Sequence, residues 1–195
     1  MIAFIYTKTD GAEYLSHLDL LRHIERTLRR AGIKVNLSEG FHPHPKIFLN
    51  NPLGLGIKSI AEHGAIDCEA DDFQSLFNAN SPAGVKCLGY RTTDISPNYA
   101  NTIETCLYSA EGINEFSVDE FLGRKELVIV DKRGRTADVR GRIHGLENRG
   151  GKLFFTLGCG ADNLRPDLFC EILEGEFGGK TRGLIKLEAH GEHTF

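Results

Sequence analysis

The stretch Tyr14-Leu-Ser-His-Leu-Asp-Leu-Leu-Arg-His-Ile-Glu-Arg-Thr-Leu-Arg-Arg-Ala-Gly32 decides the fold of the first half of the chain. Its apolar residues recur at the spacing of an amphipathic helix, with arginines on the opposite face. Ser16 is a good N-cap, Asp19 stands three residues later in the capping-box position, and Gly32 follows the last periodic residue. We therefore predict a helix from Ser16 to Ala31.

Strand patterns surround this helix. Residues 2–8 are apolar and aromatic, and further strands are predicted at 33–37, 61–69 and 85–92, with a short helix at 71–77. The resulting order, β-α-β-β-α-β over residues 2–93, is typical of a split-βαβ, ferredoxin-like domain. It predicts a four-stranded antiparallel sheet with both helices on one face.

A similar order follows a predicted linker at 94–101. Strands are expected at 104–110, 126–131, 151–158 and 184–189, with helices at 117–122 and 166–173; residues 137–147 could be a strand or an extended loop. We predict an α+β protein of two ferredoxin-like (βαββαβ) lobes in tandem, the second a degenerate copy. The domain boundaries are expected at 1–94 and 102–195.

The composition is that of a globular protein: 195 residues, 41% hydrophobic and 26% charged. The sequence has neither a signal-peptide pattern nor an apolar run long enough to cross a membrane, so we expect a cytoplasmic protein without a membrane partner. The five cysteines are widely and singly spaced. This spacing argues against disulfides, zinc ribbons and iron–sulfur motifs, and favours buried thiols.

Positive charge is concentrated in two segments of an otherwise acidic chain. Residues 22–46 and residues 124–149 each carry a balance of +4, although the whole chain carries −4. Two basic segments indicate local contact with an anion such as RNA. The alternative is that the arginines are solvated, but Asp19 and Glu25 are too few to pair with all four on the helix. The predicted RNA-binding residues are Arg22, Arg26, Arg29, Arg30, Ser38, Phe41, Lys46, Arg133 and Arg135.

Histidines flank the helix. His17 lies in its first turn, and His42 and His44 alternate with two prolines on a stiff loop after it. With Asp19, these residues could form an acid–base site, and His17, His44 and Asp19 are the catalytic candidates. His17 and His42 are the candidates for a metal site, although no metal or cofactor is expected overall. A structural role at the helix end stays open for each histidine.

The quoted residues resemble a bacterial family of unknown function, the radical-SAM-linked (radical-SAM-associated) proteins. The resemblance is carried by three segments of the first half: Tyr14–Asp19, Glu25–Gly32 and Ser38–Lys46. It also includes Pro52–Gly56, the Arg135 turn and Arg165–Asp167, and it is dense only in residues 14–56. The family often has Asn where this chain has His42, which makes His44 the better functional candidate. The resemblance implies a partner of a radical S-adenosylmethionine protein, because the three-cysteine cluster motif is absent from this sequence.

The leading hypothesis is a non-enzymatic accessory protein that presents RNA or a ribosome-related substrate to a radical SAM enzyme. The first alternative is an RNA-processing or RNA-modifying enzyme that uses His17 and His44. The second alternative is a module for protein–protein interaction only. The sequence does not distinguish a substrate, an oligomeric state or a role for the second lobe.

Overall fold

The computed structural model describes residues 1–94, 102–130, 134–192 and 194. The chain divides into two compact units, Met1–Ile103 with Glu192–Phe195 and Glu104–Gly191. Each unit combines helices with a β-sheet, so the predicted α+β class is confirmed. Most of the predicted linker, residues 95–101, lies outside the described residues.

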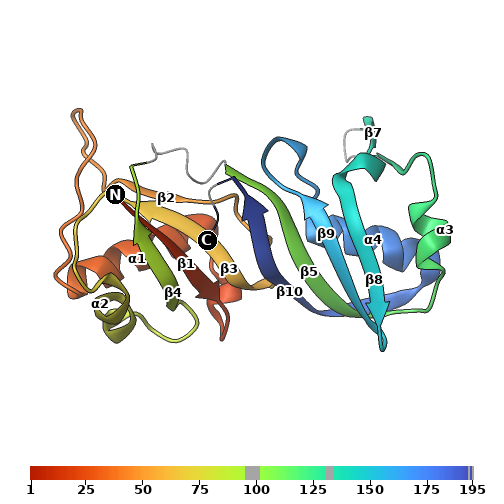
Figure 1. Ribbon diagram of the computed structural model, residues 1–195, viewed down its shortest axis with the longest axis horizontal. Coiled ribbons are helices and arrows are strands. Elements are labelled where there is room, and N and C mark those ends of the chain that lie inside the picture. The colour runs from red at the N-terminus through yellow and green to blue at the C-terminus, as the bar shows by residue number, and fades with distance from the viewer. Residues whose placement is uncertain (95–101, 131–133, 193, 195) are drawn as a thin grey trace. The chain divides into compact units, whose positions relative to one another are not determined.

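The first unit has the predicted order of elements (Figure 1). These elements are β1 (Ile2–Lys8), the short 3₁₀ turn η1 (Ala12–Tyr14), α1 (His17–Arg30), β2 (Ile47–Leu49), β3 (Lys58–Ile66), α2 (Phe73–Asn80) and β4 (Cys87–Thr92). Within this unit the strand order is β4-β1-β3, with β2 paired to β3, and all of these pairings are antiparallel.

The second strand of this unit differs from the prediction. Residues 33–37 form only two isolated bridges, Val35 with Cys68 and Leu37 with Pro45, whereas β2 begins at Ile47. Three consecutive apolar residues, Ile47–Leu49, pair with residues 64–66 of β3. In the sheet, Ile47–Leu49 occupy the strand position beside β3 that was predicted for residues 33–37, a segment of mixed polar and apolar residues.

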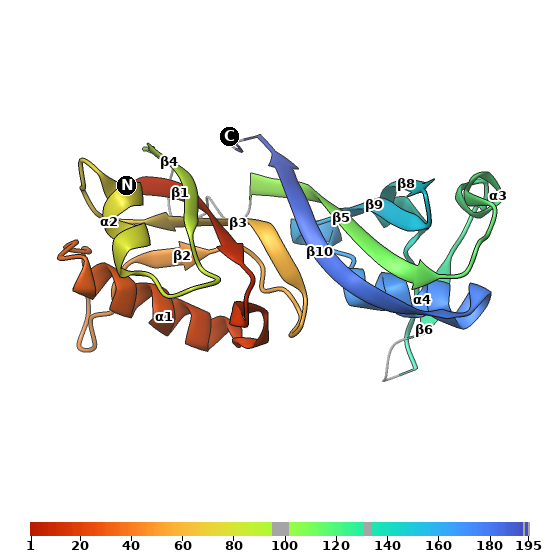
Figure 2. The ribbon, with the colours of Figure 1, turned by 90° about the horizontal axis from the view of Figure 1, so that it is seen from below.

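Both helices pack on the same face of this sheet (Figure 2). The Ser16 side chain accepts a hydrogen bond from Asp19 N at 3.1 Å, which confirms the predicted N-cap. Helix α1 buries Leu20, Ile24 and Leu28, while its arginines remain at the surface. The core between helices and sheet includes a run of aromatic contacts: Phe4 with Tyr6, Phe73 and Phe77, and Phe73 with Tyr90.

The second unit contains a sheet in the order β10-β5-β9-β8 and a separate two-stranded hairpin, β6-β7. Its elements are β5 (Ile103–Ile113), α3 (Val118–Leu122), β6 (Val128–Val130), β7 (Thr136–Asp138), η3 (Arg140–Arg142), β8 (Ile143–Arg149), β9 (Lys152–Gly158), η4 (Gly160–Asp162), α4 (Pro166–Phe177) and β10 (Gly179–Gly191). Phe155 of β9 packs on Phe169 of α4 with ring centroids 5.0 Å apart, and Phe121 of α3 contacts Phe169.

One strand prediction in this unit needs correction, and one segment that the sequence left open is resolved. The strand expected at 126–131 belongs to the hairpin and not to the main sheet, and its Val128 and Val130 are exposed. The ambiguous segment 137–147 divides between the end of β7 and the start of β8. The Asp138 carboxylate causes this division, because it accepts hydrogen bonds from the backbone N–H groups of Leu127 and Arg140 and so closes the hairpin.

All five cysteines are buried free thiols, as predicted. In the part of the chain that the structure describes, no helix is long and apolar enough to span a membrane.

Candidate functional site

A polar recess lies at the end of β1, next to the first turn of α1. Alternation along β1 directs Ile2, Phe4, Tyr6 and Lys8 toward the helices. The first three side chains belong to the aromatic and aliphatic core, but the fourth is a lysine. Glu62 is the neighbour of Tyr6 on β3. The core side of the sheet therefore changes from apolar to charged at this end.

The recess is closed by α1 and by the segment before β3. Its lining comes from strands β1 and β3, from the first turn of α1 and from the segment 50–53. These residues are Tyr6, Lys8, His17, Leu20, Asn50, Pro52, Leu53 and Glu62. Its free volume is about 10 Å³, which is roughly what one water molecule needs. Only a single small group, such as one oxygen atom, can enter it.

Two donors of this recess are buried without a hydrogen bond. Asn50 is 3% exposed, its Oδ1 accepts from Asn51 N at 2.7 Å, and its Nδ2 has no partner. Lys8 is 2% exposed, and within the described residues its ammonium group makes no hydrogen bond. Glu62 Oε1 is a buried acceptor atom of the same recess, so the recess offers an acceptor as well as donors to a small group such as one water molecule.

The charge of Lys8 is set by burial and by two carboxylates. Burial lowers the pKa of Lys8, and attraction by Glu62 and Glu13 partly offsets this shift. Glu13 is itself held by Gly11 N–H at 2.8 Å. Burial, and then the Glu62 charge, raises the pKa of Tyr6 well above its ordinary value, so this phenol stays protonated.

The first turn of α1 adds further donors at the mouth of the recess. Because Ser16 satisfies Asp19 N–H, the N–H groups of His17 and Leu18 remain at the positive end of the helix dipole. The His17 side chain is exposed and lines the recess. His17 thus borders the recess together with Leu20, the first buried apolar residue of α1.

Exposed apolar side chains accompany the recess. Tyr14, Leu18 and Leu55 are 70%, 55% and 67% exposed, and each lies within three residues of a lining residue in the sequence. Gly56 brings two of these segments together: its N–H donates to Glu13 O at 2.9 Å, and a Cβ there would lie 3.8 Å from the Tyr14 ring. We call Tyr14, Leu18, Pro52, Leu53 and Leu55 the apolar rim.

The predicted basic face of α1 is largely occupied. Arg22 pairs with Asp19 at 3.3 Å and Arg29 with Glu25 at 3.0 Å. Arg30 donates to the main-chain oxygen of Asn80. Arg26 is exposed and makes no ion pair with any described residue. Surface ion pairs of this kind are weak, so Arg22 and Arg29 can exchange partners at little cost.

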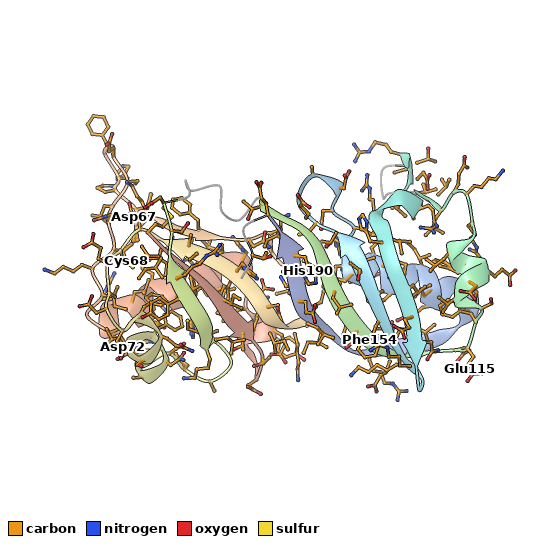
Figure 3. All side chains as sticks on the ribbon, in the orientation of Figure 1. Asp67, Cys68, Asp72, Glu115, Phe154 and His190 are labelled. Carbon is orange, nitrogen blue, oxygen red and sulfur yellow. The ribbon has the colours of Figure 1, made fainter. Side chains whose placement is uncertain are left out.

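The loop between α1 and β2 projects from the first unit (Figure 1). Ser38 N donates to His44 O at 2.8 Å, and His44 N donates to Ser38 Oγ at 3.0 Å, so Ser38 closes the loop. Phe41 is fully exposed at its tip. Lys46 pairs with Asp67 at 3.4 Å at the base of the loop, where Asp67 is labelled in Figure 3.

The structure does not bring the histidines of the helix and the loop together. Pro45 borders a groove with Glu25, Leu28 and Arg29, so the loop sits against the last turns of α1. His17 is in the first turn, and the eleven residues from it to Leu28 span about 16 Å of helix. Figure 2 shows the loop and η1 at opposite ends of α1. Among the described residues, no three or more metal-ligating side chains lie together.

Two arginines of the second unit hold its backbone together, and others form ion pairs with carboxylates. Arg140 donates to Leu122 O and Ile143 O, and Arg142 donates to Asn163 O at 3.2 Å. Arg135 is exposed next to β7, and Arg133 lies outside the described residues.

A family profile described as "Uncharacterized protein conserved in bacteria (DUF2344)" matches residues 2–166. The chain belongs to this family. The matched range includes every residue that lines the recess and the whole loop between α1 and β2. Nothing in the match links the family to radical SAM chemistry, so that part of the resemblance is not shown. No curated protein matches the chain.

One similar solved structure is titled "Crystal Structure of a Cbf5-Nop10-Gar1 Complex". It shares 12% identity with this DUF2344 member at a TM-score of 0.49, and the alignment covers 95% of this chain and 49% of the other. The chain therefore spans about half the length of that protein. A likeness this distant says nothing about function.

The recess was not predicted from the sequence, because residues 2–8 were assigned to a strand without asking which of their side chains face the core. Lys8 ends the apolar run of β1 in phase with Phe4 and Tyr6, so alternation alone points its side chain to the core side. Lysine is almost never buried without a reason. Asn50 gave no comparable signal, because it lies in an irregular segment whose path depends on contacts distant in the sequence.

Proposed function

We propose that this protein is a non-enzymatic accessory protein that binds RNA or a ribosome-related substrate for a radical SAM enzyme. The observation that carries a binding role is the recess, where segments 14–19 and 52–56 meet although they are far apart in the sequence. Both segments belong to the stretches that resemble radical-SAM-linked proteins. The radical SAM partner itself rests on that resemblance alone.

RNA is favoured as the substrate by two features of the first unit. Arg26 offers an exposed guanidinium group, and the ion pairs of Arg22 and Arg29 are weak enough to open toward phosphates. Phe41 offers an exposed ring for stacking on an unpaired base. The predicted contributions of Ser38, Lys46, Arg133 and Arg135 stay proposals, as does that of Arg30, which is bound to Asn80.

The test measures binding of a fluorescent single-stranded RNA at several salt concentrations, together with co-purification of a radical SAM enzyme from the same bacterium. We expect affinity to fall steeply with salt and to weaken in Arg26→Ala, with Lys180→Ala in the second unit as control. RNA binding that does not depend on salt, or none at all, would remove the RNA substrate. Failure to co-purify would remove the radical SAM partner.

The enzyme hypothesis loses its proposed pair of histidines, because His17 and His44 lie at opposite ends of α1. It keeps His17 beside the recess, with Asp19 held in the cap and paired with Arg22. The interaction-module hypothesis is favoured by the apolar rim, since exposed apolar clusters often mark partner surfaces. Binding of the radical SAM enzyme without RNA would support that alternative.

We also propose that both units are ferredoxin-like, over the domains 1–94 and 102–195. The strand orders β4-β1-β3-β2 and β10-β5-β9-β8 support this proposal, because each is the 4-1-3-2 order when the β6-β7 hairpin is treated as an insertion. A cytoplasmic location remains a further prediction.

A further inference from the structure

The buried side of the recess offers donors and an acceptor together. Tyr6 pairs with Glu62 across β1 and β3, and Asn50 N donates to the main-chain oxygen of His63 at 3.0 Å, so Asn50 lies beside Glu62. Asn50 Nδ2 is a buried donor without a hydrogen-bond partner, and Glu62 Oε1 is a buried acceptor. Lys8 adds an ammonium group, and Lys8, Asn50 and Glu62 are each more than nine-tenths buried.

The size of the recess limits what can enter it. Its free volume of about 10 Å³ holds one oxygen or nitrogen atom. Among the lining residues, His17 and Pro52 are exposed, so the recess opens on their side. The rest of any ligand therefore stays outside and is joined through this opening to a group of one heavy atom.

Hydrogen-bond counting selects among such groups. A carbonyl oxygen can accept from Asn50 and Lys8, but it brings no hydrogen to Glu62 Oε1. An ammonium group can donate to Glu62, but it faces the donors of Asn50 and Lys8. A hydroxyl group has one hydrogen and two lone pairs. It can donate to Glu62 Oε1 and accept from Asn50 Nδ2 and Lys8, so it matches all three.

We propose that the recess binds one hydroxyl group, and that in RNA this group is the 2′-hydroxyl of a ribose. This inference rests on the proposed function, because it names the part of an RNA that the first unit recognises. The 2′-hydroxyl is both a donor and an acceptor, and it is the group by which a protein distinguishes RNA from DNA. It projects from the sugar by one bond, which leaves the sugar and its phosphates outside the recess.

The experiment compares three fluorescent single-stranded oligomers, of uridine, 2′-deoxyuridine and 2′-fluoro-2′-deoxyuridine, by anisotropy with the full chain. All three have the same bases and phosphates. The fluoro sugar keeps the ring conformation of ribose, but its fluorine cannot donate a hydrogen bond. We expect both modified oligomers to bind roughly tenfold more weakly than the uridine oligomer, since water can refill the recess and limit the loss. Equal affinity of the uridine oligomer and either modified oligomer would overturn the inference.

Two variants and a control locate the effect in the recess. Asn50→Asp keeps the acceptor for Asn51 N–H but removes the donor, and Lys8→Met removes the ammonium group at nearly constant length. In each, the ratio of uridine to deoxyuridine affinity should fall toward one, a readout that a general loss of binding does not move. Lys34→Met changes an exposed lysine beyond the other end of α1 and should leave the ratio unchanged. A ratio preserved in both folded recess variants would refute the assignment.

The side-chain NH₂ signal of Asn50 in the ¹⁵N-labelled chain separates this inference from the proposed function. The uridine oligomer should shift this signal, and so should methanol, whereas acetonitrile, which accepts but does not donate, should not. If the oligomers bind with a steep salt dependence but leave Asn50 unmoved, the inference fails and the accessory role stands. If methanol alone shifts Asn50 and no oligomer binds, the RNA substrate of both proposals is refuted and only a hydroxyl site remains. If nothing shifts the signal and no oligomer binds, the recess holds only water and both proposals fail.

Discussion

The Arg30 guanidinium group donates two hydrogen bonds to the main-chain oxygen of Asn80, from Nε at 3.1 Å and from Nη2 at 2.8 Å. Asn80 is the last residue of α2, so its carbonyl oxygen has no partner within the helix. Nη2 also reaches Thr27 Oγ1 at 3.1 Å. An arginine that the sequence predicts as an RNA ligand therefore joins the C-terminal ends of two helices.

Replacing Arg30 with alanine should lower the free energy of unfolding by about 1–2 kcal/mol, because a charged donor pair to an exposed carbonyl is lost. Urea unfolding followed by far-UV circular dichroism measures this change. Arg26→Ala is the matched control on the same helix face, and it should change stability by less than about 0.5 kcal/mol. Equal effects of the two variants would show that the Arg30 contact contributes nothing.

Releasing Arg29 from Glu25 should strengthen RNA binding if α1 contacts phosphates. In Glu25→Gln the 3.0 Å ion pair is lost and the helix face gains one positive charge. Affinity for single-stranded RNA should rise, and the slope of log K against log salt should steepen by up to about 0.7 for one added phosphate contact. Filter binding at several salt concentrations measures both quantities.

The control for that variant is Glu115→Gln, which makes the same charge change on an exposed residue of the second unit (Figure 3). If both variants raise affinity equally, the effect is one of net charge and not of the Arg29 site.

The sequence was sufficient for features that depend on neighbours in the chain. Local spacing predicts the helix that begins after Ser16, the Ser16 cap that accepts from Asp19 N–H, and the buried face of the helix. The structure contains all three. The short helix capped by Ser117 is found for the same reason, since Ser117 Oγ accepts from Glu120 N. Helical periodicity and N-capping depend only on residues that are close together in the chain, so a single sequence is enough to predict them.

Features that depend on distant partners were not predictable in this way. Residues 33–37 have strand-like composition, but the pairing positions on β3 are taken by the more apolar Ile47–Leu49. The partners of the arginines were also invisible, because Asn80 lies 50 residues from Arg30. The recess combines β1, α1, β3 and the irregular segment 50–53, so no single stretch of sequence indicates it.

The cysteine thiols should be unreactive in the folded protein. Burial raises the pKa of Cys68 and Cys87 to about 11 and that of Cys170 to about 12. At pH 8 the thiolate fraction of a group with a pKa of 11 is about a hundredfold lower than for an ordinary thiol near 9. Ellman's reagent should detect almost no thiol in the native protein and five after unfolding in guanidinium chloride.

The same shifts predict how stability depends on pH. Between about pH 9 and pH 11 the unfolded chain loses thiol protons that the folded chain keeps, so the free energy of unfolding falls as pH rises through this window. Below the ordinary thiol pKa these groups contribute no slope. Cys68→Ala should reduce the slope between pH 9 and 11, and an unchanged slope would show that the Cys68 thiol has the same pKa in the folded and unfolded chains.

Gly84 is the position where a single methyl group should be most damaging to the first unit. Its φ is +88°, and a Cβ there would lie 2.0 Å from the main-chain oxygen of Thr9. The Gly84 carbonyl also accepts from Thr9 N and from Thr7 Oγ1, both at 2.9 Å, so the backbone cannot move away without losing these bonds. Gly84→Ala should therefore cost more than about 3 kcal/mol of folding free energy.

Gly32→Ala is the control, because Gly32 also has a positive φ but nothing within 4 Å of the added methyl group, and it should cost only about 1–2 kcal/mol. Thermal unfolding of both variants separates the clash from the backbone strain, and equal losses of stability would mean that the Thr9 contact relaxes freely.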